Sequence, residues 1–287
     1  MSRLSLSLAL IGGLWSFQDP APPAAKLEVR APAAGDRTEV KIESTFELDV
    51  ETKSNQDEPG VKSVRQLSYV RTVECSQVVQ SAQEGQVPTF RITVNAAKLQ
   101  KSGTNMAPAT EASEMESKSF VVTRTDKGRV VKAENGDPAP ADAAGLGAWE
   151  DFGSLLPKGE PKEGESWKVD AAAVAALISI PDLPVAAGTF DAKVESLADN
   201  KLVVFFTGAI EGKTAKGFDM KLTVKEGRLT FDVAKSRPAS LAIVGELVGM
   251  KEIHQKVSRQ RELRQIEEKV GEVRVTSRKL EVKVEFK

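Results

Sequence analysis

Few residues in this chain could carry out a reaction by themselves. His254 is the only histidine and Cys75 the only cysteine among 287 residues. A Ser-His-Asp or Cys-His mechanism would need His254 as its base. This histidine lies among Lys, Glu and Gln, a context typical of a solvated surface. Cys75 lies in an alternating apolar run, which favours a small buried side chain over a reactive thiol. The sequence therefore indicates no nucleophilic catalytic residue.

Other familiar site patterns are also missing from the sequence. It contains no H-E-x-x-H or C-x-x-C spacing for zinc and no glycine-rich phosphate loop between a strand and a helix. We therefore expect no metal and no cofactor. Acidic residues are numerous, so a carboxylate-based hydrolase stays open as a minor alternative. The formal net charge of −1, with basic and acidic residues interspersed, predicts no nucleic-acid partner.

The N-terminal segment has the pattern of an export signal. Arg3 is followed by the apolar run Leu4–Trp15 and then by polar, Pro- and Ala-rich sequence. That run is too short to cross a hydrocarbon core of about 30 Å as a helix. We expect a signal peptide over residues 1–18, with an uncleaved signal anchor as the alternative, and a linker over 19–37. The mature protein is then periplasmic or extracellular, with no transmembrane span and with association to the cell envelope left open.

Most of the remaining sequence alternates between apolar and polar residues, as antiparallel strands with one buried face do. The first such run covers residues 39–50, well beyond the usual strand of about 5–6 residues. Strands of this length must twist and curl. The patterns predict a mainly β domain over residues 38–287. Its core is a long curved antiparallel sheet, forming a half-barrel or open barrel, with one or two short helices.

Several segments between the alternating runs are less regular. Residues 101–117 are small and polar, and we predict a mobile loop there. The triplet 225–227 separates two alternating runs and predicts the turn of a hairpin. Residues 248–271 fit either a charged helix or the ends of two long strands joined by a polar turn. A change of parity at 277–279 predicts a bulge or a tight turn.

A helical period stands out where Leu146, Trp149, Phe152 and Leu156 recur at steps of three and four residues. Asp142 is the predicted N-cap of this short helix. The apolar side of the helix could plug the end of a curved sheet, or it could form a lid over a ligand cavity. The four apolar residues are therefore our candidates for plug or ligand-cavity residues.

The segment after this helix contains the most distinctive pattern of the chain. We expect Pro157 to end the helix, Gly164 to set a turn, and Trp167 to anchor the core at the start of the next strand. These three residues are predicted to be structural. The segment then joins two halves of one sheet, residues 38–156 and 165–287.

The motif LP-x-x-x-P-x-x-G-x-x-W at residues 156–167 resembles one found in uncharacterised bacterial exported β-rich proteins. Residues 217–245 are similar to the closing hairpins of that group. This chain departs from the group at residues 162–163, where Lys-Glu replaces a common Val-x-Val pair. The resemblance implies a curved antiparallel sheet closed by a short helix, analogous to the half-barrels of periplasmic lipoprotein carriers. It implies no catalytic or ligand-binding residues.

These patterns favour a binding protein over an enzyme. We expect an exported, non-enzymatic protein that binds a lipid or another apolar or amphipathic ligand in the concave face of its sheet. The alternative is a structural or interaction component of the cell envelope, which contacts a protein partner through its charged face or C-terminal segment. The first hypothesis depends on whether Trp149 and Phe152 leave the concave face open or fill it.

Overall fold

The described part of the chain forms one antiparallel sheet with short helices on one face. The computed structural model describes residues 33–54, 62–81, 88–125, 128–178, 187–214, 216–259 and 264–287. The predicted signal peptide, residues 1–18, lies outside these residues, as does most of the predicted linker, 19–37. No helix within the described residues is long and apolar enough to span a membrane.

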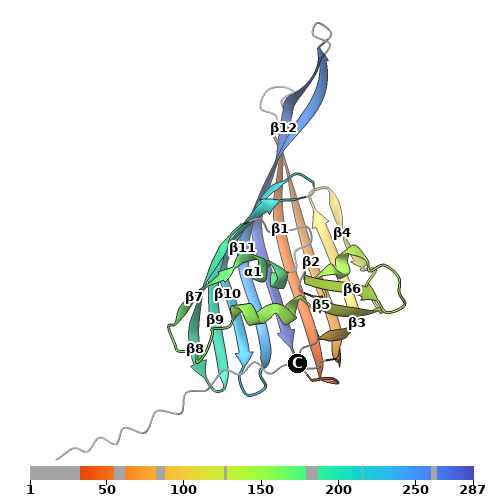
Figure 1. Cartoon of the computed structure of the whole chain (residues 1–287). Helices are drawn as coiled ribbons and strands as arrows, with labels where there is room; N and C mark the ends of the chain where they lie inside the picture. The colour runs from red at the N-terminus through yellow and green to blue at the C-terminus, as the bar shows by residue number, and fades with distance from the viewer. Residues whose placement is uncertain are drawn as a thin grey trace, which may run out of the picture.

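Over the described residues the sheet has 12 strands and remains open, with β6 and β7 at its two edges (Figure 1). The strand order is β6-β5-β3-β2-β1-β12-β11-β10-β9-β8-β7, and β4 pairs with the part of β3 that β5 leaves free. The strands are β1 (Arg37–Ser54), β2 (Lys62–Ser81), β3 (Thr89–Gly103), β4 (Met106–Ala112), β5 (Ser119–Thr125), β6 (Gly128–Ala133), β7 (Ser166–Asp170), β8 (Thr189–Ala198), β9 (Lys201–Lys213), β10 (Asp219–Asp232), β11 (Arg237–Arg259) and β12 (Arg264–Phe286). The prediction of a mainly β protein with a long curved antiparallel sheet is confirmed.

Alternation along each strand divides the sheet into a buried face and a solvated face. On β9, Leu202, Val204 and Phe206 are buried in the core, while Lys201 at the start of the strand is exposed. The solvated face carries cross-strand ion pairs, each of which contributes only about 0–1 kcal/mol. These pairs include Lys168–Asp191, Lys221–Glu211, Lys225–Glu246 and Arg228–Glu195. The free energy of folding therefore comes mainly from the other, concave face.

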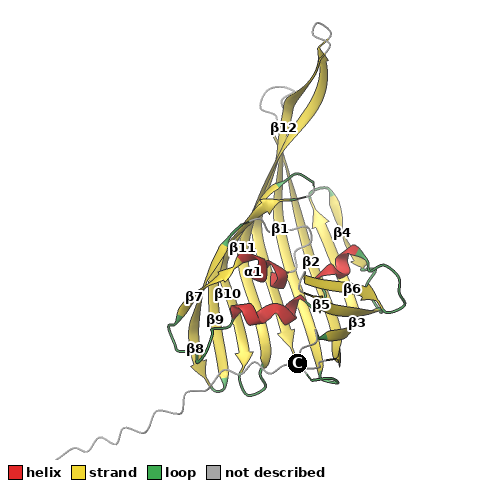
Figure 2. Cartoon of the chain, in the orientation of Figure 1, coloured by secondary structure: helices red, strands yellow, loops and turns green. Residues whose placement is uncertain are grey.

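Short helices cover the concave face, as Figure 2 shows in red. They are two 3-10 helices, η1 (Ala141–Gly145) and η2 (Ala148–Leu155), and the α-helix α1 (Ala171–Ile178). Gly147 lies between η1 and η2 with φ of 74°, a left-handed conformation that interrupts the predicted helix. The predicted N-cap is wrong: Pro140 precedes η1, and Asp142 lies in its first turn. The Asp142 carboxylate instead accepts a hydrogen bond from the Ser113 hydroxyl.

Two local predictions fail because strand pairing overrides turn composition. Most of residues 101–117, predicted as a loop, belongs to β3 and β4, which pair with each other. The predicted hairpin turn at 225–227 lies inside β10, which continues through it with a bulge. Gly227 is required there for space, because a Cβ on it would lie 2.3 Å from Cε2 of the Phe206 ring. The predicted bulge at 277–279 is confirmed by the register shift between β1 and β12.

Residues 248–271 extend strands β11 and β12, so the strand alternative is confirmed over their described part. Strand β11 pairs with β10 as far as Met250, and β12 pairs with β1 as far as Gly271. Beyond these points, residues 251–259 of β11 pair only with β12 among the described residues, and residues 264–270 of β12 pair only with β11. We call these two segments the two-stranded arm. Figure 1 shows this two-stranded arm projecting away from the rest of the sheet.

The two halves of the sheet meet where β1 pairs with β12. This contact joins the first and last of the described strands, with Val40 opposite Phe286. The backbones of Glu39 and Lys287 exchange hydrogen bonds of 3.1 and 2.9 Å beyond it. The segment after η2, which contains Pro157 and Gly164, leads instead to the edge strand β7. It connects the halves along the chain but lies far from their contact in strand order.

Candidate functional site

The helices fill the middle of the concave face. All four candidate plug or cavity residues, Leu146, Trp149, Phe152 and Leu156, are buried in the core. Trp149 is 3% exposed, and the ring centroids of Phe152 and of Phe231 on β10 are 5.7 Å apart. Only a space of about 20 Å³ remains beneath Leu146 and Trp149. These four residues therefore pack against the sheet, and we call them, with the helix η2 between Leu146 and Leu156, the plug.

A buried hydrogen-bond chain fixes the plug to the sheet. The indole Nε1 of Trp149 donates to Oε1 of Gln77 at 2.8 Å. The Gln77 Nε2 in turn donates to Oε1 of Glu150 at 2.6 Å. Gln77 is on the concave side of β2 and only 3% exposed, so its amide needs these partners. These two hydrogen bonds hold the Trp149 indole in place and fix its orientation.

A cavity of about 640 Å³ lies beside the plug, on the part of the concave face formed by β1, β2 and β3. Its size is within the range of about 300–1,000 Å³ usual for small-molecule sites. Phe46, Tyr69 and Leu99 contribute apolar surface to the wall. Residues of β4, the loop after it and η1 complete the lining, including Ala112, Ser113 and Asp142. This cavity, which we call the β2 cavity, is the candidate functional site.

Arg71 is the unusual residue of the β2 cavity. On the concave face of β2 it occupies the position between Tyr69 and Val73, because side chains two residues apart share a face. Its cross-strand neighbours are Ser44 on β1 and Leu99 on β3, and all three line the β2 cavity. The next concave row toward the plug is apolar throughout and contains Ala97, Val73, Ile42, Val284, Leu241, Leu229 and Val204.

The guanidinium of Arg71 has little protein to bind. Its Nη2 donates to the backbone oxygen of Asp142 at 3.1 Å, which is its one hydrogen bond to other described residues. Burial lowers the pKa of Arg71, and the charge of the Asp142 carboxylate acts in the opposite direction. Arginine nevertheless stays protonated in proteins, so the β2 cavity contains a partly desolvated cation.

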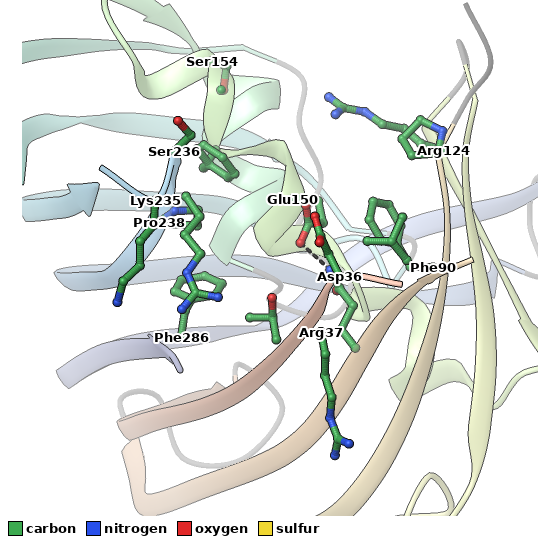
Figure 3. A pocket seen from close by; sticks show the side chains of 17 residues that line it. Asp36, Arg37, Phe90, Arg124, Glu150, Ser154, Lys235, Ser236, Pro238 and Phe286 are labelled. Carbon is green, nitrogen blue, oxygen red and sulfur yellow. Dashed lines mark hydrogen bonds between the residues drawn. The ribbon is translucent and has the colours of Figure 1, made fainter. Parts of the chain in front are cut away.

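A second cavity, of about 550 Å³, lies at the other end of the plug (Figure 3). Phe90, Phe152 and Phe286 contribute apolar surface to it. Charged residues of both signs also line it, among them Asp36 and Glu150, which Figure 3 labels. The remaining charged lining residues are Arg37, Arg124, Lys235 and Arg237. Arg37 already pairs with Glu39 at 2.9 Å, and Lys235 with Asp232 at 3.6 Å. We therefore favour the β2 cavity.

The three predicted structural residues lie away from the β2 cavity. Pro157 is buried directly after η2, and Gly164 has φ of 81° in the turn before β7. Trp167 is on β7, opposite Ala192, and packs against the edge of the core while remaining partly exposed. Its Nε1 is buried without a hydrogen-bond partner among the described residues. None of the three lines the cavities described above.

The residues considered for catalysis are not brought together. His254 is exposed on the two-stranded arm, where its Nε2 lies 3.3 Å from a Glu252 oxygen. Cys75 is buried, which confirms the prediction for it, and burial raises the pKa of its thiol to about 12. Within the described ranges, no three His, Cys, Asp or Glu side chains are grouped as metal ligands would be.

Comparisons with known proteins add no family. No protein-family model matches the chain, and no curated protein matches its sequence. The site must therefore be judged on its own geometry.

Sequence reasoning missed Arg71, the residue that distinguishes the β2 cavity. The signal was available, because Arg71 has the same parity as Leu67, Tyr69, Val73 and Cys75. A basic residue at an inward position of an otherwise apolar alternation either has a buried partner or faces a cavity. Gln77 continues the same parity and was missed in the same way.

Proposed function

We propose that this chain is an exported, non-enzymatic protein that binds an amphipathic molecule in the β2 cavity. One observation carries the proposal: the plug fills the middle of the concave face but leaves about 640 Å³ open beside Phe46, Tyr69 and Leu99. Apolar walls with a few polar groups are the usual composition of a small-molecule site. Export rests on the sequence of residues 1–18.

Native mass spectrometry of protein purified without detergent is the first test. We expect a species heavier than the chain alone that loses its ligand on collisional activation. Purified protein should also bind the neutral fluorescent probe N-phenyl-1-naphthylamine, whose emission rises in apolar sites. A bare chain mass together with no probe fluorescence would contradict the proposal.

A matched pair of variants on β3 locates the binding site. Leu99→Trp adds volume inside the β2 cavity, and it should weaken probe binding by about tenfold or more through overfilling. Gln100→Trp places the same side chain on the next residue, which is exposed on the other face of the strand. Equal weakening by both variants would place the probe elsewhere.

A second function is favoured by the two-stranded arm. Ile253 is exposed on β11 within the arm, with 36% of its surface accessible, and Met250 is exposed directly before the arm, with 42%. We propose as the alternative that the arm contacts a protein of the cell envelope. Deleting residues 248–287 cannot test this, because β12 lies in the middle of the sheet.

A shortened arm is the better test of this alternative. Replacing residues 255–268 by Asn-Gly joins His254 to Lys269, which already face each other, through a two-residue turn. Crosslinking in envelope fractions should then lose any partner held by the arm, while probe binding in the β2 cavity stays unchanged. An identical set of crosslinked proteins would rule out the removed part of the arm as the contact.

A further inference from the structure

The polar groups of the β2 cavity are unevenly distributed. Apolar surface comes from Phe46, Tyr69 and Leu99, whereas the deeper polar groups are the Arg71 guanidinium and the Ser44 hydroxyl. Ser44 is 8% exposed and lies directly opposite Arg71 in the pairing of β1 with β2. Both residues also line the small space that continues from the β2 cavity beneath the plug. A cation and a hydroxyl thus meet at the inner end of an apolar wall.

The guanidinium forms no direct ion pair, although the charge of the nearby Asp142 carboxylate favours its protonated form. No ion pair within 4.0 Å joins Arg71 to an acidic residue in the described part of the chain. Its hydrogen bond goes to the Asp142 backbone oxygen, while the Asp142 side chain accepts from Ser113. A guanidinium has five N–H donors, and this single bond uses one of them. Leaving the others without acceptors in a partly desolvated site is costly, so a ligand that accepts them gains affinity.

The acidic residues of the lining do not supply those acceptors. Glu111 pairs with Lys101 at 2.5 Å, and Glu114 is exposed. Lys98 is an exposed cation of the same lining. Charges in such positions are screened by water and salt, so the partly buried guanidinium is the stronger determinant of ligand charge.

We propose that the amphipathic ligand has an anionic head group, a carboxylate or a phosphate, which binds the Arg71 guanidinium while its chain packs on Phe46, Tyr69 and Leu99. This inference rests on the proposed function and specifies its ligand class. Arginine presents parallel N–H donors that match both oxyanions, and the Ser44 hydroxyl is placed to add another donor. Arg71 is then the residue that selects acidic over neutral amphiphiles.

Competition against N-phenyl-1-naphthylamine at pH 7 tests the selection. The competitors are decanoate, decyl phosphate and 1-decanol, which share one alkyl chain and differ in the head group. We expect the wild-type protein to bind at least one of the two anions about tenfold more tightly than the alcohol, the size of one charge-assisted hydrogen bond. The stronger anion shows whether the head group is of the carboxylate or the phosphate type.

Arg71→Met keeps an unbranched apolar stem and removes the cation. The ratio of anion to alcohol affinity should fall to about one, while alcohol binding stays within about threefold of wild type. Arg71→Lys keeps the positive charge but lacks the planar pair of N–H donors, so it should give an intermediate ratio of anion to alcohol affinity. The Arg71→Lys variant also tests the role of the guanidinium if Arg71→Met fails to fold. Lys98→Met removes the exposed cation and should leave the ratio nearly unchanged.

The outcomes separate the inference from the function on which it rests. Equal affinity for anions and alcohol in the wild type, or an anion preference that survives Arg71→Met, would overturn the inference and leave the binding function standing. Failure of every competitor and of the probe itself to bind would overturn both. Loss of the preference in Lys98→Met but not in Arg71→Met would assign it to the cavity mouth and would also overturn the inference.

Discussion

Single residues on the inner face of β2 show two ways in which a polar group can occupy an apolar wall. Gln77 has a partner at both the oxygen and the nitrogen of its amide, which is held between the Trp149 indole and the Glu150 carboxylate. Arg71 has one hydrogen-bond partner among the described residues, the backbone oxygen of Asp142, and it faces a cavity. The first arrangement fixes a plug against the sheet. The second leaves a charge for a ligand to neutralise.

The Gln77–Trp149 contact gives the first prediction. Trp149→Phe keeps most of the buried ring but removes the Nε1 donor, which leaves the buried Gln77 oxygen unpaired. We expect the free energy of unfolding, measured by urea titration, to fall by about 1–3 kcal/mol beyond any packing loss. Combining Trp149→Phe with Gln77→Met should cost less than the sum of the two single changes, since both partners are then apolar. Strict additivity would show that the bond does not stabilise the fold.

Cys75 gives a prediction about alkaline pH. Burial raises the pKa of its thiol from 9.0 to about 12 in the folded protein. The unfolded chain therefore loses this proton first as pH rises, so stability should decline from about pH 9 toward pH 12. Cys75→Ala should show a smaller decline in urea titrations over that window. Identical pH profiles for the two proteins would contradict the assignment.

At the scale of elements, composition predicted strands better than it predicted turns. The long alternation of β1 and the bulge opposite it in β12 follow directly from the parity of apolar residues. Residues 225–227 were misread because a glycine after a charged pair has the composition of a turn. In the structure, Gly227 serves a packing need set by Phe206, a residue far away in sequence. Such a need is invisible in the local pattern.

The path of β10 gives a prediction for this element. In Gly227→Ala the new Cβ would lie 2.3 Å from a ring carbon of Phe206, whose side chain is completely buried. We expect unfolding in urea to require about 1–3 kcal/mol less than in the wild type, as for an overpacked core.

Two variants serve as controls for this prediction. Gly153→Ala should change stability little, because no described atom other than those of its chain neighbours and of its own helix backbone lies within 4 Å of the added Cβ. Gly227→Ala with Phe206→Leu should recover part of the loss relative to Phe206→Leu alone. A harmless Gly227→Ala would mean that the strand does not need this glycine.

For the whole molecule, the alternating runs predicted an open curved sheet but not its strand order. Any strand with one apolar face can pair with any other, so a single sequence does not specify that β1 and β12 are neighbours. The site shares this limit. Ser44, Arg71 and Leu99 come from three strands, and they become one row only when the register of those strands is known. The position of Arg71 on the inward-facing side of β2 identifies it as unusual, but the sequence alone cannot show that it faces a cavity.

The central position of β12 has a consequence for how the chain is made. Strands β1 to β6 and β7 to β11 can pair within each group as they are synthesised, but each group leaves one strand, β1 or β11, with an unpaired edge. Both strands expose backbone donors and acceptors until residues 264–286 arrive to fill the gap between them. The sheet therefore cannot be completed vectorially from its N-terminus, and the nascent chain stays incompletely folded until β12 is available. Such a delay would favour the export that we propose, because a translocation channel passes an unfolded chain.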